Sequence, residues 1–129
     1  MVGNQAKLYA PPEYWKLSKS ALEEIVNGCG SAQAKFDFVP DSIWFLDISP
    51  ACYIHDYMYF VGETLEDKES ADRVFLNNML RLIDAETKWR LLKWLRRKTA
   101  KLFYQAVKNF GGPSFWEGKN REEEERLAG

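Results

Sequence analysis

The sequence has few cysteines and histidines and no long apolar run, and each shortage excludes a class of protein. Its 129 residues include two cysteines and one histidine. Two cysteines exclude a disulfide-dense mini-protein, although one bridge is possible. No apolar run reaches the roughly eighteen residues of a membrane span, and the N-terminus shows no signal peptide, so we expect no transmembrane segment. The location stays open: cytoplasmic by default, or exported without a signal peptide.

The net charge is also low, but it is unevenly distributed. Eighteen Lys and Arg against nineteen Asp and Glu give a formal charge of −1, which argues against a nucleic-acid partner. Residues 86–110 nevertheless hold eight cations and a single acidic residue, Glu86, which predicts a local basic surface. The length and the 46% hydrophobic content suit one domain over residues 1–118, with its core at about 17–110, followed by a charged tail at 119–129.

Apolar residues mostly recur at helical spacing and strand signals are weak, so the sequence predicts a mainly α fold. Phe36 to Val39 is the best strand candidate, and it is short. An irregular arm should occupy residues 1–15, pinned by its aromatic residues, and a long loop should occupy residues 27–49. The expected helices are a short one from Ser18 or Ser20 to about 26, two antiparallel ones at about 50–62 and 69–84, and a basic C-terminal one at about 86–110.

The predicted C-terminal helix divides into two arcs when its side chains advance by 100° per residue. One arc is apolar and should pack on the body of the protein. It contains Leu91, Leu92, Leu95, Thr99, Leu102, Phe103, Ala106 and Phe110. The other arc is basic and should face either solvent alone or, for a protein that acts on lipid, an anionic membrane surface. It contains Arg90, Lys93, Arg97, Lys98, Lys101 and Lys108, with Trp94 and Tyr104.

The chemistry is concentrated on the first of the two antiparallel helices. Cys52, His55, Asp56 and Tyr59 are spaced at i, i+3, i+4 and i+7, so they share one side of that helix. On the next helix, Asp72 heads an apolar stripe, where an ionised carboxylate is costly unless it is paired. Antiparallel packing would bring the single histidine level with this carboxylate. A histidine supported by a buried carboxylate is a general base.

These residues carry a family resemblance. The run from Cys52 to Tyr59, with His55-Asp56 at its centre, resembles the active-site helix of secreted-type phospholipases A2. Gly28-Cys29-Gly30 resembles the calcium loop of that family. Ala71-Asp72-Arg73 resembles the site that supplies its second aspartate. The resemblance covers about residues 17–84.

The resemblance implies calcium-dependent hydrolysis of the sn-2 ester of a glycerophospholipid. His55 would deprotonate the attacking water, Asp72 would orient His55, and Tyr59 would donate a hydrogen bond to Asp72. Asp56 and the carbonyls of Gly28 and Gly30 would bind calcium, which accepts carboxylate and carbonyl oxygens and would stabilise the oxyanion.

The family also pairs the two matching cysteines, which implies a bridge between Cys29 and Cys52. Two departures from the common pattern are visible. Residues 31–34 replace the usual glycine-rich stretch of the loop, and only sixteen residues separate His55 from Asp72. The short spacing leaves no room for the β-hairpin wing of animal enzymes and resembles the compact forms of microbial proteins and parvovirus capsids.

The same residues also allow other interpretations. A zinc site made from both cysteines and His55 is disfavoured, because a structural zinc site usually has four such ligands. Asp41 and Asp47 fit capping and turn formation better than metal binding. The main alternative is a catalytically silent helical module that binds an anionic membrane or a protein partner through its basic C-terminal helix.

Overall fold

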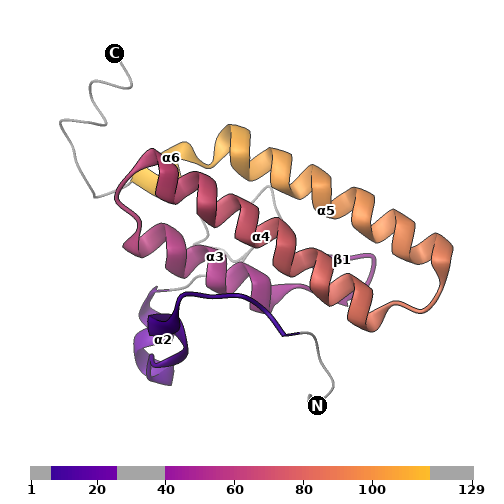
Figure 1. The fold of residues 1–129 in the computed structure, drawn as a ribbon, viewed down its shortest axis with the longest axis horizontal. Coiled ribbons are helices and arrows are strands. Elements are labelled where there is room, and N and C mark those ends of the chain that lie inside the picture. The colour runs from indigo at the N-terminus through magenta and orange to yellow at the C-terminus, as the bar shows by residue number, and fades with distance from the viewer. Residues whose placement is uncertain (1–6, 26–39, 117–129) are drawn as a thin grey trace.

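The computed structural model describes residues 7–25 and 40–116. Within these ranges the fold is mainly α, as the sequence predicts. The elements are α1 (Pro12–Trp15), α2 (Lys19–Ile25), β1 (Ser42–Ile43), β2 (Leu46–Asp47), α3 (Ser49–Val61), α4 (Leu65–Glu86), α5 (Arg90–Phe110) and α6 (Gly112–Trp116). The three long helices lie side by side, with α4 packed against both α3 and α5 (Figure 1).

Helices α3 and α4 are the predicted antiparallel pair, and local hydrogen bonds define where each begins. Pro50 lies in the first turn of α3, but Ser49 is already helical, and its backbone N–H donates to Asp47 Oδ1 at 2.9 Å. The N-cap position is Ile48, so Asp47 forms a local turn before α3 and satisfies one backbone N–H of its first turn. Thr64 and Asp67 form a reciprocal capping box, each side chain accepting from the other residue's backbone N–H at 3.1 Å. Because of this box, α4 begins at Leu65, four residues earlier than predicted.

Two glycines allow close packing around the end of α3. A Cβ at Gly62, which follows α3, would lie 2.7 Å from the ring of Phe115. A Cβ at Gly111, which follows α5, would lie 2.6 Å from the Tyr59 hydroxyl oxygen. Phe115 is fully buried, so α6 docks on the core through this ring. The glycines therefore bring the end of α5 directly against the side chains of α3.

The orientation of α5 differs from the prediction. Arg96, Ala100 and Val107 form its buried side, whereas Leu91, Leu102 and Phe110 are mostly exposed. Arg96 can be buried because its guanidinium donates to Thr87 Oγ1 at 2.7 Å and to the Trp44 carbonyl at 2.7 Å. Phe103 and Ala106 of the predicted apolar arc do pack against the core, but the prediction did not include Arg96 in the packed side. Part of the apolar arc of α5 consequently faces solvent.

The N-terminal segment contains one helical turn, α1, where the sequence predicts an irregular arm. Asn78 of α4 pairs with the backbone of Tyr9, accepting from its N–H at 2.8 Å and donating to its carbonyl at 2.9 Å. The Tyr14 ring contacts that of Tyr57 edge to face. A buried amide therefore anchors this segment together with its aromatic residues.

Within the predicted loop 27–49, the described part forms a small hairpin. Strands β1 and β2 pair antiparallel, with Ser42 opposite Asp47 and Ile43 opposite Leu46. The strand predicted at 36–39 and the charged tail at 119–129 lie outside the described residues, so these remain predictions. No helix in the described part of the chain is long and apolar enough to cross a bilayer.

Candidate active site

Helix α3 turns its polar side toward the interior of the protein. His55 and Tyr59, one turn apart, are both buried, and their ring centroids lie 4.2 Å apart. The His55 ring also stacks on Phe75 of α4, at 4.6 Å between centroids. Phe115 closes the other side of Tyr59 with an edge-to-face contact at 5.2 Å. The imidazole and the phenol are therefore held in a dry pocket with little freedom to rotate.

Asp72 of α4 meets both of these groups with one oxygen. Its Oδ1 lies 2.9 Å from His55 Nε2 and accepts a hydrogen bond from the Tyr59 hydroxyl at 2.7 Å. Asp72 is almost fully buried, so these contacts replace the water that an exposed carboxylate would bind. The structure thus brings together the three residues that the sequence predicted as a catalytic group.

Lys68 is a fourth member of this cluster, and the sequence analysis missed it. Its ammonium donates to Asp72 Oδ2 at 2.7 Å and to the Val107 carbonyl at 3.1 Å, although lysine is rarely buried. The Val107 carbonyl lies in the last turn of α5 and also accepts from the Gly111 backbone N–H at 2.9 Å, so its oxygen has two donors. The i, i+4 spacing of Lys68 and Asp72 was the available signal, since such pairs meet on a helix surface.

The surroundings of Asp72 favour its charged form. Burial alone raises its pKa, but the hydrogen bonds from His55, Lys68 and Tyr59 outweigh this effect and hold the pKa of Asp72 below its usual value. Burial, followed by the charge of Asp72, raises the pKa of Tyr59 far above its ordinary range. Asp72 is consequently an ionised acceptor and Tyr59 a neutral donor at neutral pH.

The predicted calcium ligands are only partly within the described residues. Asp56 follows His55 on α3 and is half-buried, so it can present a carboxylate beside the imidazole. In the described ranges, no three His, Cys, Asp or Glu side chains cluster as a metal site would require. Gly28 and Gly30 lie in the stretch 26–39, which is not described. Asp56 fits a hard cation by its chemistry, and any carbonyl ligands from the loop stay a prediction.

Cys52 lies one turn before His55 and is fully buried and disulfide-bonded. The partner that the sequence predicts, Cys29, lies outside the described residues. A cysteine already in a disulfide does not supply a thiolate for metal binding, which removes Cys52 from the disfavoured zinc site.

The cluster has the parts of a general base held in one orientation. An Nε2–H of His55 that donates to Asp72 makes Nδ1 the basic nitrogen, because a neutral imidazole has one donor and one acceptor. Tyr59 and Lys68 fix the carboxylate from two further directions.

In comparisons with known proteins, no family model, no curated protein and no solved structure matches this chain.

Proposed function

We propose that the protein hydrolyses the sn-2 ester of glycerophospholipids in a calcium-dependent reaction of the phospholipase A2 type. The observation that carries this proposal is the buried contact between His55 Nε2 and Asp72 Oδ1, reinforced by the Tyr59 hydroxyl. Imidazole and carboxylate in this arrangement support proton abstraction from water. The order of motifs along the chain supports the same reaction.

Each residue of the cluster then has a defined task. His55 takes the proton from the attacking water at Nδ1 and later returns it to the leaving alkoxide. Asp72 keeps the imidazole in the tautomer with its proton on Nε2 and stabilises the imidazolium by its negative charge. Tyr59 holds the carboxylate oxygen that faces His55. Phe75, stacked on the imidazole, helps to exclude competing water.

Asp56 is the proposed side-chain ligand of calcium, with the carbonyls of Gly28 and Gly30 as further ligands. Bound calcium would polarise the ester carbonyl and stabilise the oxyanion. The proposed partner surface is a peripheral anionic membrane, because α5 carries seven cations and no acidic residue.

Lys68 favours a second candidate, the catalytically silent membrane-binding or protein-binding module. Its ammonium contacts Asp72 at 2.7 Å and neutralises part of the charge that would support a protonated His55. A module of this kind would keep the fold and the buried ion pair without cleaving an ester. The two candidates share the structure and differ in whether an ester is cleaved.

The discriminating experiment measures fatty acid release from a phospholipid labelled in its sn-2 chain, with calcium and with a chelator. We expect release by the wild type only with calcium, and none by His55→Gln. Calorimetry should show calcium binding by His55→Gln and its loss in Asp56→Asn. Absence of release by a folded, calcium-loaded wild type would overturn the enzymatic proposal in favour of the silent module. Equal calcium affinity in Asp56→Asn would overturn the metal site.

A further inference from the structure

The turn between β1 and β2 has an unusual composition for its backbone. Ile43 pairs with Leu46, so Trp44 and Phe45 form a two-residue hairpin loop. Their φ angles are 46° and 72°, both in the left-handed region. Such loops favour Asn-Gly, since bulky side chains are strained at positive φ. Two consecutive aromatic residues therefore occupy positions where the backbone disfavours them.

The position of Trp44 has a structural explanation. Its carbonyl accepts two hydrogen bonds from the Arg96 guanidinium, at 2.7 and 3.3 Å, and its indole N–H donates to Thr99 Oγ1 at 3.0 Å. These contacts attach the turn to the middle of α5. Trp44 therefore offsets part of its strain by fixing the hairpin.

Phe45 has no comparable explanation, because its side chain is 98% exposed. A residue that is both strained and exposed contributes little to folding, and such outliers cluster at functional positions. The anchoring of Trp44 holds Phe45 at the tip of a supported turn. The turn thus presents an aromatic ring to the exterior in a defined place.

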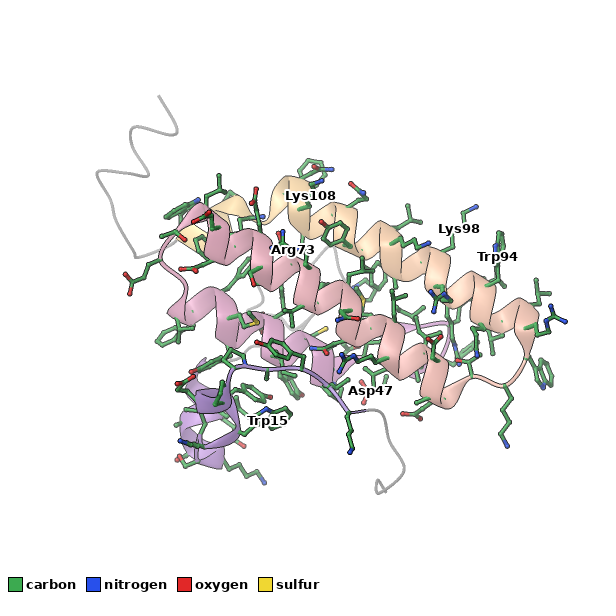
Figure 2. The ribbon with its side chains drawn as sticks, in the orientation of Figure 1. Trp15, Asp47, Arg73, Trp94, Lys98 and Lys108 are labelled. Carbon is green, nitrogen blue, oxygen red and sulfur yellow. The ribbon has the colours of Figure 1, made fainter. Side chains whose placement is uncertain are left out.

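The side of α5 next to this turn is also apolar and exposed. Leu102 lies three residues after Thr99 and Leu91 lies eight before it, which at 100° per residue places them about 60° and 80° around the helix from Thr99, between Thr99 and Lys98. They are 61% and 71% exposed. Lys98, four residues before Leu102, borders this side, with its ammonium 5.1 Å from the Trp94 ring centroid. Figure 2 shows Trp94 and Lys98 on the outer side of α5.

We propose that Phe45, Leu91 and Leu102 form an insertion surface that enters the headgroup layer of an anionic bilayer. The inference deepens the proposed function, on which it rests for lipid as the substrate. Charge identifies the occupant: α5 has no acidic residue, and Lys98 borders the surface. Lysine is depleted in protein–protein interfaces, whereas basic residues beside exposed apolar ones are typical of segments that lie on anionic lipid.

The surface also changes the docking geometry expected from the sequence. The apolar arc that was predicted to pack on the body now supplies the inserting residues, and the basic arc supplies the flanking charges. Insertion of one aromatic ring and two leucines removes apolar area from water, and the cations attract anionic headgroups over a longer distance.

The test measures vesicle binding by co-sedimentation in a chelator, so that no lipid is hydrolysed. The variant is Phe45→Gly, and the matched control is Phe60→Ala, which removes an equally aromatic, 61% exposed side chain from α3. On mixed phosphatidylcholine–phosphatidylserine vesicles, we expect Phe45→Gly to bind about tenfold more weakly and Phe60→Ala to bind as the wild type does. Phe45→Leu should restore most of the binding.

Thermal unfolding separates this effect from misfolding. Glycine tolerates positive φ, so Phe45→Gly should unfold at the same temperature as the wild type or higher. Unchanged vesicle binding by Phe45→Gly, an equal loss in Phe60→Ala, or equal wild-type binding to pure phosphatidylcholine would each overturn the proposal. These outcomes do not involve ester cleavage, so a wild type that binds through Phe45 but releases no fatty acid would overturn the proposed function alone.

Discussion

The buried side-chain cluster between α3 and α4 and the exposed side of α5 both depart from the usual distribution of residues, in opposite directions: the first buries polar groups and the second exposes apolar ones. Around Asp72, polar side chains are buried and hydrogen-bonded to one another. Around Phe45, apolar side chains face solvent on a backbone with positive φ. Both arrangements are costly for folding alone. The proposed site for proton transfer and the proposed surface for membrane attachment therefore lie in separate parts of the molecule, so a substitution in one should leave the other intact.

The largest effect on stability is expected when one charge is removed from the buried cluster around Asp72. Lys68→Met removes the ammonium and leaves the Asp72 carboxylate with one fewer partner in a buried place. We expect the free energy of unfolding to fall by about 3 kcal/mol, the usual loss when half of a buried ion pair is removed. Urea unfolding measures it. Lys101→Met, which removes an exposed lysine of α5, is the control and should change stability little.

A smaller loss of stability is expected from a substitution at Gly111, where the end of α5 contacts Tyr59. In Gly111→Ala the new Cβ would lie 2.5 Å from the Val107 carbonyl oxygen and 2.6 Å from the Tyr59 hydroxyl oxygen, so the end of α5 or the phenol must shift. We expect a loss of about 2 kcal/mol in the free energy of unfolding. Gly112→Ala is the matched control, since a Cβ there meets nothing within 4 Å. Equal stability of the two variants would contradict the tight packing around Tyr59.

The smallest effect is the acid dependence of stability. The pKa of Asp72 is lower in the folded protein than in the unfolded chain, so its contribution is complete above the unfolded value of about 4. That contribution is lost as the pH falls through the folded value. We expect the free energy of unfolding to decrease below about pH 4, and to decrease less steeply in Asp72→Asn. Identical slopes would contradict a stabilised carboxylate.

The same comparison explains what the sequence could predict. Helix spacing grouped His55 with Tyr59, and antiparallel packing of the next helix placed Asp72 level with His55. The contact between Tyr59 and Asp72 was predicted only from the family resemblance. Lys68 was missed because its burial depends on backbone carbonyls of α5, a contact between distant parts of the chain. The packed side of α5 was only partly predicted: Phe103 and Ala106 of the apolar arc pack on the core, but the burial of Arg96 depends on Trp44 and Thr87, which helical periodicity does not include.

The sequence did not predict the hairpin formed by β1 and β2. Trp44-Phe45 carries none of the residues that mark a two-residue turn, so its left-handed backbone has no local signature. The contact with Arg96 and Thr99 fixes it from another element. The sequence therefore did not predict residues whose conformation depends on contacts with distant parts of the chain, and the structure was needed to find them.

The most direct test of the central claim is the rate of sn-2 fatty acid release by Asp72→Asn, measured with calcium beside the wild type. The account predicts a fall of about a thousandfold with calcium affinity retained, because an amide no longer holds the basic tautomer of His55 or stabilises its protonated form. A folded Asp72→Asn variant that releases fatty acid at the wild-type rate would contradict the role of the buried pair.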